Sequence, residues 1–182
     1  MRTILGEKYK GEENVEEVMI RKAQSGDEKD FAYIQVQSWI SAFSSILPVE
    51  TMQRMTDLKR LESMYARNIQ NADTELYLQL IHHKAHGIAG WSKERSGALD
   101  RTAELICIHS LPDKRRCGYG SALIDAVLQD IKACRCYDQV VLWVFEENHT
   151  ARKFYERHGF EATEERKDSF GASEMMYRKR LE

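Results

Sequence analysis

Long apolar runs, proline and an excess of one charge are all scarce or absent in this 182-residue sequence. No apolar run reaches the roughly 18 residues that a membrane-spanning helix needs. The two prolines, with 42% apolar and 31% charged residues, exclude a collagen-like, low-complexity or disordered chain. With 27 basic and 29 acidic residues, the net charge of -2 creates no overall field that would attract nucleic acid or a membrane. An ordinary globular protein with neither partner is therefore expected.

Cysteine is too sparse to suggest a disulfide framework. The four cysteines are Cys107, Cys117, Cys134 and Cys136, and the polar, charged N-terminus does not resemble a secretory signal. Free thiols in a reducing cytoplasm are therefore predicted. Cys134 and Cys136 would need two further ligands to hold a metal ion, and the neighbouring sequence offers none. No metal site is predicted.

The length predicts a single domain, because domains commonly have about 100–200 residues. Residues 1–17 are polar with acidic runs, so they are expected to form a lead-in to one domain over residues 18–182. Apolar residues then recur with strand and helix periods in turn. Strands are predicted at Val18–Arg21, Thr74–Ile81, His86–Lys93, Ala103–Leu111, Asp138–Phe145, Phe160–Glu165 and Ser173–Lys179, and helices from Glu28, after Pro48, at Gly118–Cys134 and at Thr150–His158. This order predicts an α/β fold with a mixed sheet flanked by helices.

The most informative segment is a basic loop, L-P-D-K-R-R-C-G-Y-G-S at residues 111–121, between a buried strand and a helix. The first N–H groups of a helix have no partner within it, and the helix dipole adds positive potential there. Gly118 and Gly120 would let phosphate oxygens approach the backbone, and Arg115 and Arg116 add positive charge. The segment lacks the spacing of a P-loop and the third glycine of a dinucleotide fingerprint. It indicates either another kind of phosphate site or a plain helix start whose glycines allow close packing.

The sequence R-R-C-G-Y-G at residues 115–120 resembles the R/Q-x-x-G-x-G/A motif of the GNAT family of N-acetyltransferases. The preceding strand, A-E-L-I-C-I-H-S-L-P, is similar to that family's central strand. A second family motif is matched by Asn148, Ala151, Phe154, Tyr155, Gly159 and Phe160. The resemblance is specific between Ala103 and Phe160. It implies a mixed sheet in which two adjacent parallel strands splay apart.

The resemblance implies acetyl-CoA as the cofactor and coenzyme A as the product. The pantetheine arm would lie between the strands Ala103–Leu111 and Asp138–Phe145 and pair with backbone groups of Ile108, His109 and Ser110. Asn148 matches a position that contacts the cofactor in the family. The pyrophosphate would lie against the segment made of Arg115, Arg116, Cys117, Gly118, Tyr119, Gly120 and Ser121.

The resemblance further implies direct transfer of the acetyl group to a primary amine in a ternary complex. Tyr155 matches the family's tyrosine near the sulfur and is the candidate general acid, with a core aromatic as the alternative. Glu104 stands where some members carry a glutamate base, and the alternative is a carboxylate paired with a basic residue such as Lys93. Trp143 stands where members that acetylate protein N-termini carry a glutamate, so that base is missing. A water chain is the remaining path for the proton.

The acceptor is the least readable part of the function. Tyr33, Trp39 and Phe43 are candidate residues of the acceptor pocket, although their spacing also suits the buried face of a helix. The substrate is expected to be an amine-bearing small molecule or peptide, and the protein a monomer or a homodimer. Two other functions stay open: an acyl-CoA-binding sensor without turnover, and a protein that binds a different phosphate compound at Gly118 and Gly120.

Overall fold

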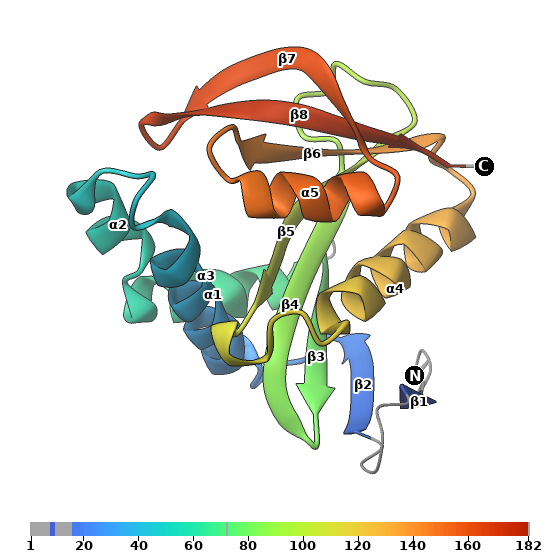
Figure 1. The fold of residues 1–182 in the computed structure, drawn as a ribbon. Helices are drawn as coiled ribbons and strands as arrows, with labels where there is room; N and C mark the ends of the chain where they lie inside the picture. Colours follow the sequence, from blue (N-terminus) through green and yellow to red (C-terminus); the bar gives the residue numbers. More distant parts are fainter. Residues whose placement is uncertain (1–7, 10–15, 72, 182) are drawn as a thin grey trace.

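A computed structural model of the chain describes residues 8–9, 16–71 and 73–181. Its strands are β1 (Lys8–Tyr9), β2 (Glu16–Lys22), β3 (Glu75–Ile81), β4 (Lys84–Lys93), β5 (Thr102–Ser110), β6 (Gln139–Phe145), β7 (Glu161–Ser169) and β8 (Ala172–Arg180). Its helices are α1 (Glu28–Phe43), α2 (Val49–Met55), α3 (Leu58–Gln70), the 3-10 turn η1 (Pro112–Lys114), α4 (Tyr119–Cys134) and α5 (His149–Arg157). The strands lie in the order β1-β2-β3-β4-β5-β6-β8-β7, with helices around them (Figure 1). The mixed α/β sheet predicted from the sequence is confirmed.

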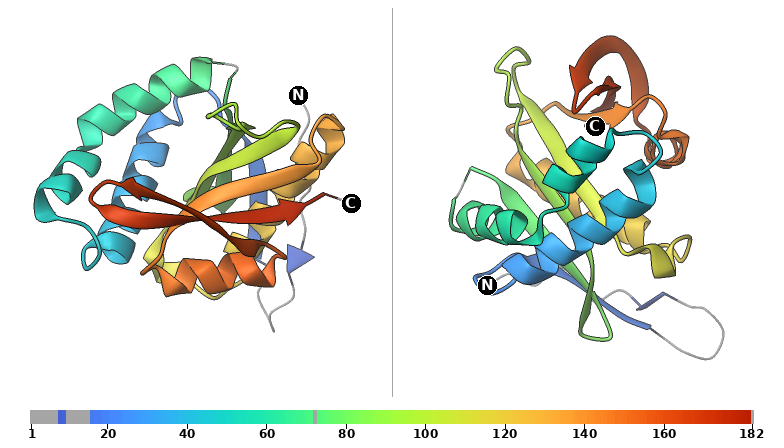
Figure 2. Two further views of the ribbon diagram at one scale, coloured as in Figure 1. Left: turned by 90° about the horizontal axis from the view of Figure 1, so that it is seen from above. Right: turned by 90° about the vertical axis from the view of Figure 1, so that its left-hand side faces the viewer.

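Helices cover both faces of the sheet because successive strand residues point to opposite sides. Leu78 and Ile88 face α1 and α3, where Phe31 is fully buried among them. The neighbouring Tyr77 belongs to a second core, which α4 and α5 build on the other face with residues such as Leu123. Figure 2 shows these helices on either side of the strands. The β5 strand therefore lies between two packed layers.

The strands β5 and β6 form the one parallel pair in the described part of the chain, and their pairing is short. It joins Thr102 to Gln139, Ala103 to Val140 and Glu104 to Val141. Beyond these residues β5 continues to Ser110 against β4, while β6 continues to Phe145 against β8. The two strands therefore separate after Glu104 and Val141, which confirms the predicted splay. Backbone groups on the facing edges beyond this point are not used for pairing between β5 and β6.

The N-terminal boundary differs from the prediction. The first predicted strand begins at Glu16 instead of Val18, because Lys8 and Tyr9 pair with Glu17 and Glu16 and extend it. The polar lead-in thus contributes a short strand to the sheet. The rest of that lead-in, residues 1–7 and 10–15, lies outside the described residues.

The helical segment expected after Pro48 is two helices. The first ends at Met55, and Asp57 then caps α3 by accepting a hydrogen bond from the Arg60 N–H at 3.0 Å. A side-chain cap satisfies one of the N–H groups that a helix start leaves unpaired, so a new helix can begin there. The apolar spacing continues across the break, which is why the pattern alone did not reveal it.

Candidate active site

Helix α4 begins directly after the basic loop, and no side chain caps its first turn. Gly118 is the N-cap residue, with a φ of +86° and no side-chain hydrogen bond. The first hydrogen bond inside the helix is donated by Ala122 to the Gly118 carbonyl at 3.1 Å. The N–H groups of Tyr119, Gly120 and Ser121 therefore lack partners within the helix. This is the arrangement that a phosphate site requires.

The two glycines of this loop are not needed for close packing within the protein. A Cβ added at Gly118 would meet no atom within 4 Å, although the left-handed φ would strain any side chain there. A Cβ at Gly120 would be 3.5 Å from the Phe154 ring, which is ordinary contact. The alternative of glycines that allow close packing is therefore wrong. Open space next to Gly118 is available to a ligand.

A buried glutamine ties the first turn of α4 to the sheet. Gln79 lies on β3 with no exposed surface, and its Nε2 donates to the Tyr119 carbonyl at 2.8 Å. The Tyr119 ring stands edge-on to His86, with centroids 5.4 Å apart. Gln79 was not among the residues predicted from the sequence, although it stands out as a polar residue within the apolar strand E-L-Y-L-Q-L-I. Because a buried polar group needs a partner, such a residue indicates a specific contact.

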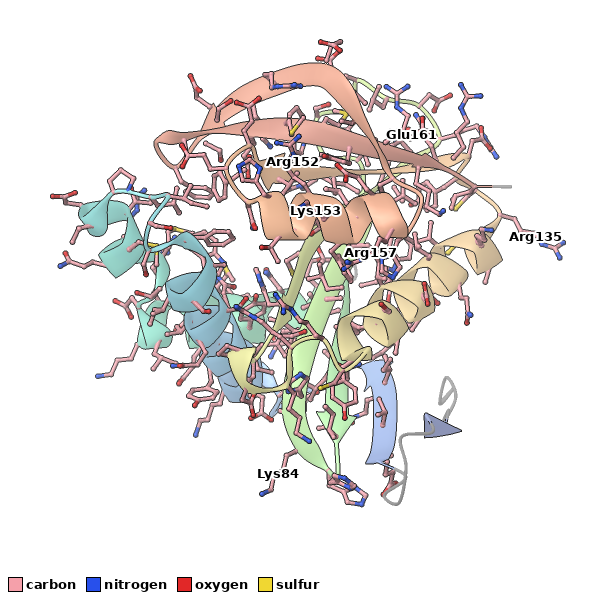
Figure 3. All side chains as sticks on the ribbon, viewed as in Figure 1. Lys84, Arg135, Arg152, Lys153, Arg157 and Glu161 are labelled. Carbon is pink, nitrogen blue, oxygen red and sulfur yellow. The ribbon has the colours of Figure 1, made fainter. Side chains whose placement is uncertain are left out.

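Positive charge surrounds the loop. Arg115, Arg116 and Cys117 are exposed, and Arg116 has a left-handed φ of +66°. Lys114 lies with its Nζ 5.8 Å from the centroid of the Tyr119 ring. Figure 3 shows further basic side chains along α5, Arg152, Lys153 and Arg157, on the side of the molecule that also carries α4.

The remaining predicted cofactor residues lie at the open ends of the two splayed strands. Ile108, His109 and Ser110 are the last residues of β5, and each pairs with β4 on the side away from β6. Asn148 follows β6 and caps α5, since its Oδ1 accepts a hydrogen bond from the Ala151 N–H at 3.1 Å. Its amide nitrogen is the part left for a cofactor. The carboxyl ends of parallel strands meet at one edge, so the basic loop and Asn148 follow the same end of the sheet.

Tyr155 is buried on α5 among aromatic rings. Its ring centroid lies 5.5 Å from that of Phe154, 5.9 Å from that of Phe160 and 6.4 Å from that of Tyr177. Burial raises the pKa of the phenol above its usual value, which keeps the hydroxyl protonated at neutral pH. The hydroxyl therefore carries a proton that it can donate, although the raised pKa makes it a weaker acid than a free phenol. The aromatic packing of the alternative interpretation is present, and the acid role stays a prediction.

Glu104 is the last β5 residue that pairs with β6, and its carboxylate has a partner. Its side chain is 4% exposed, and Arg95 from the β4–β5 loop donates to both oxygens, with Nε to Oε2 at 2.9 Å and Nη2 to Oε1 at 2.5 Å. The Arg95 N–H adds a third hydrogen bond at 3.2 Å. The basic partner is therefore Arg95 and not Lys93, because the loop folds back over the strand.

His109 presents a neutral imidazole beside α1. Burial lowers its pKa to about 4, so the ring is uncharged at neutral pH. Its Nδ1 lies 3.4 Å from the Ser38 hydroxyl of α1. The sequence assigned only its backbone to the cofactor. The side chain joins the splayed half of β5 to the first helix.

The expected acceptor wall is only partly assembled. Trp39 and Phe43 stack edge-on with centroids 5.0 Å apart, and Phe145 at the end of β6 lies 5.2 Å from Phe43. Phe170, in the β7–β8 turn, lies 5.7 Å from Trp39. Tyr33 does not join them: it is 50% exposed and points about 120° away from Trp39 around the helix. Tyr33 is therefore corrected to a surface residue of α1.

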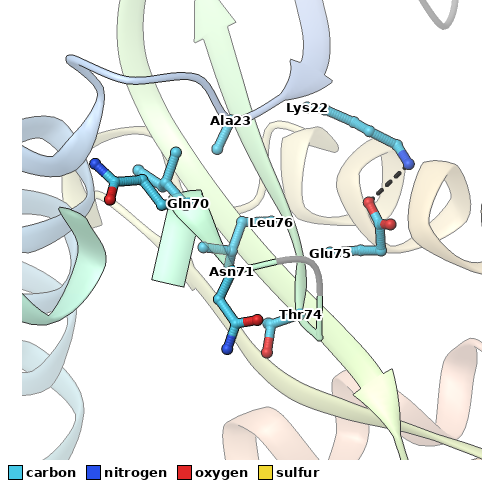
Figure 4. A pocket seen from close by; sticks show the side chains of 8 residues that line it. Lys22, Ala23, Gln70, Asn71, Thr74, Glu75 and Leu76 are labelled. Carbon is cyan, nitrogen blue, oxygen red and sulfur yellow. Dashed lines mark hydrogen bonds and ion pairs between the residues drawn. The ribbon is translucent and has the colours of Figure 1, made fainter. Parts of the chain in front are cut away.

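A separate cavity lies away from these residues. It has a volume of about 230 Å³ and is bordered by the 2.7 Å ion pair between Lys22 and Glu75 (Figure 4). Its lining is Lys22, Ala23, Ile69, Gln70, Asn71, Thr74, Glu75 and Leu76. None of these residues belongs to β5, β6 or the basic loop, so the cavity is not part of the candidate active site.

Comparison with known proteins agrees with this geometry. The sequence pattern of the Acetyltransferase (GNAT) family matches residues 39–160. The chain belongs to the GNAT family of acetyltransferases. Transfer of an acyl group from acetyl-CoA is the reaction of this family. A curated relative, the uncharacterized N-acetyltransferase YuaI of Bacillus subtilis, is 24% identical over 131 residues, which are 72% of this chain and 73% of the relative.

Solved structures show the same GNAT fold. The PaiA N-acetyltransferase of Thermoplasma acidophilum, in complex with coenzyme A, has a TM-score of 0.75 and 18% identity, with 90% of this chain and 99% of that chain covered. The putative acetyltransferase YncA of Salmonella typhimurium, with acetyl-CoA, has a TM-score of 0.68 and 17% identity, with 91% and 94% covered. Both of these neighbours hold a form of coenzyme A.

Three further observations concern membrane spans, metal ligands and cysteines. No helix within the described ranges is both long and apolar enough to cross a membrane. No three His, Cys, Asp or Glu residues among those described come together as metal ligands. The four cysteines are free.

Proposed function

We propose that this protein transfers the acetyl group of acetyl-CoA to the primary amine of a small molecule or peptide, directly within a ternary complex. One observation carries the proposal. The β5–β6 pairing stops after Glu104 and Val141, and the open stretch of β5 leads through η1 and the basic loop to the uncapped start of α4. One continuous segment thus offers an unpaired strand edge followed by unpaired helix N–H groups.

The residues present fit acetyl-CoA. Backbone N–H groups of residues 116–121 would hold the pyrophosphate, with the guanidinium groups of Arg115 and Arg116 nearby. The free edge at Ile108–Ser110 would pair with the amide groups of the pantetheine arm. Asn148 would contact the arm through its amide nitrogen. These contacts are mainly main-chain contacts, which explains why a cysteine at position 117 is compatible with the site.

Direct transfer is supported by the state of the thiol on the splayed half of β5. Cys107 lies on the splayed half of β5, and burial raises its pKa to about 12. A protonated thiol is a poor nucleophile, since the thiolate is the reactive form. Cys107 is therefore unsuited to carry an acetyl group, which supports direct attack of the amine on the thioester.

Proton transfer needs an acceptor and a donor, because an amine with a pKa near 10 is protonated at neutral pH. Tyr155, which matches the tyrosine that the family places near the sulfur, donates a proton to the departing sulfur. Both oxygens of Glu104 already accept hydrogen bonds from Arg95. Glu104 would have to break that contact to accept a proton. We therefore assign the removal of the amine proton to water and give Glu104 the role of holding Arg95.

The experiment measures binding and turnover separately. Acetyl-CoA should raise the melting temperature, whereas ATP and NAD should not, since only a bound ligand stabilises the fold. Release of coenzyme A is then followed with a thiol reagent over a panel of amines. Acetyl-CoA binding without any turnover would contradict the transferase and support the sensor. A shift with ATP or NAD instead would support a different phosphate ligand.

Tyr155→Phe tests the acid. It should lower turnover by about ten- to a thousandfold, the range for a lost acid, with acetyl-CoA affinity unchanged. Tyr33→Phe is the matched control, because it removes the same hydroxyl from an exposed position on α1. Equal turnover in the two variants would exclude Tyr155 from the acid role.

A further inference from the structure

A lysine side chain of the protein occupies a cation site on the splayed half of β6. The Nζ of Lys167 lies 4.2 Å from the centroid of the Trp143 ring. The same atom lies 3.5 Å from Oε2 of Glu174, whose side chain is 11% exposed. An aromatic face and a carboxylate together form a receptor for a positively charged nitrogen. Lys167 itself is 40% exposed, so this occupant is in contact with solvent.

Strand register places this cation site on the face of the sheet that carries Glu104. Glu104 pairs with Val141 at the last step before the strands separate, and alternation puts Trp143 on the same face two residues later. Glu174 pairs with Phe145 on one side and with Lys167 on the other. Lys167 therefore reaches across β8 to the indole ring. The aromatic cluster around Phe145 closes one end of this face.

Electrostatics connect the cation site to the start of the splay. The pKa of the Arg95 guanidinium is raised, first by its hydrogen bond to Glu104 and in smaller part by the charge of Glu174. Glu174 thus lies within electrostatic reach of the pair that marks the opening of the strands. A ligand held at Glu174 would lie beside the gap between the splayed strands β5 and β6, and not at a remote surface.

We propose that Trp143 and Glu174 form a subsite for a second, non-reacting cationic group of the acceptor amine, and that Lys167 occupies it until the acceptor displaces it. This inference rests on the proposed acetyl transfer and names its substrate class: a primary amine that carries another ammonium group on an alkyl chain. The space released by Lys167 is that of its own butylammonium side chain, which sets the kind of group that fits.

Charge explains why the subsite holds the non-reacting nitrogen. A neighbouring carboxylate favours the protonated form of a bound amine. A protonated amine has no lone pair to attack a thioester, so the reacting nitrogen has to lie elsewhere on the same face. Displacement of Lys167 costs little because an ion pair with a partly exposed lysine contributes only about 0–1 kcal/mol. The nearly buried Glu174 keeps a cationic partner throughout, which avoids an unpaired buried charge.

The test compares α,ω-diaminoalkanes of three to eight carbons with n-alkylamines of the same length. The wild-type protein should show a KM for the best diamine at least tenfold below that of the matched monoamine. Glu174→Gln and Trp143→Leu should remove this preference and leave the monoamine unchanged. Lys167→Ala should lower the KM for the diamine several-fold, because its internal competitor is gone.

Two exposed residues provide charge-matched controls. Lys84, at the tip of the β3–β4 hairpin, and Glu161, at the far end of β7, are labelled in Figure 3, and Lys84→Ala and Glu161→Gln should leave the diamine preference intact. Calorimetric titration of the diamine into the protein with coenzyme A measures binding at the subsite in the absence of turnover. If no amine reacts, diamine binding that Lys167→Ala strengthens and Glu174→Gln abolishes would still support the subsite, while the transferase would fail. The proposed subsite would be overturned if the substitutions affected the diamine and the monoamine equally, or if neither assay showed a preference for the diamine.

Discussion

Variants that break the contact between Arg95 and Glu104 show whether Glu104 is part of a structural ion pair or acts as a catalytic base. Removing one partner of a fully buried pair costs about 3–5 kcal/mol. The Glu104 side chain is 4% exposed, but that of Arg95 is 57% exposed, so water offsets part of this loss. We expect Arg95→Ala to lower the free energy of unfolding by about 2–3 kcal/mol, because it leaves a nearly buried carboxylate unpaired. Glu104→Gln should cost about 1–2 kcal/mol, because the freed arginine can turn to solvent.

The assay is urea unfolding of both single variants and of the double variant, with turnover measured on the same samples. The double variant should lose less stability than the sum of the two single losses, by about 1–2 kcal/mol, since no charge is left unpaired. Turnover should fall less than about tenfold, and to a similar extent, in both single variants. Arg180→Ala, at the exposed end of β8, is the control for loss of an arginine.

A different result would refute this reasoning. If Glu104→Gln lowered turnover by about a hundredfold or more, with stability unchanged and Arg95→Ala active, Glu104 would be the general base. The pH profile adds a second criterion, because a base lost by substitution also removes the acidic limb of kcat/KM.

The loop and the imidazole of His109 give two further predictions. Gly118→Ala should weaken acetyl-CoA binding at least tenfold, whereas Gly26→Ala, which has a similar left-handed φ and equally open space, should cost similar stability without changing affinity. Equal affinities in both variants, measured by calorimetry, would exclude the loop as the phosphate site. Because the pKa of His109 is lowered to about 4, the unfolded chain binds its proton first, and stability should fall as the pH drops below about 6.5. Between pH 7 and pH 5 the free energy of unfolding, measured with urea, should fall by up to about 2 kcal/mol, and His109→Gln should not show this decrease. The same decrease in His109→Gln would mean that other groups cause it.

The local pattern of apolar residues was sufficient to predict an element where that element buries one face against the core. Alternation along T-E-L-Y-L-Q-L-I and the helical stripe after Gly118 predicted β3 and α4 within one residue of their ends. It failed at Thr56 and Asp57, where the apolar spacing runs on but a side-chain cap starts a new helix. It also failed for Tyr33, because both sides of an amphipathic helix can carry an aromatic residue and only packing shows which side is buried.

By itself the sequence determined the family motifs, the order of the elements from β3 to β8, and the basic loop before α4, because these depend on neighbours within a few residues. Only the tertiary structure decided which residues meet when they lie nine to forty positions apart. It brought Arg95 onto Glu104, Gln79 onto the Tyr119 carbonyl, and Lys167 onto the Trp143 ring. These contacts depend on strand order and register, which bring distant residues together through backbone pairing and leave no periodic trace along the chain.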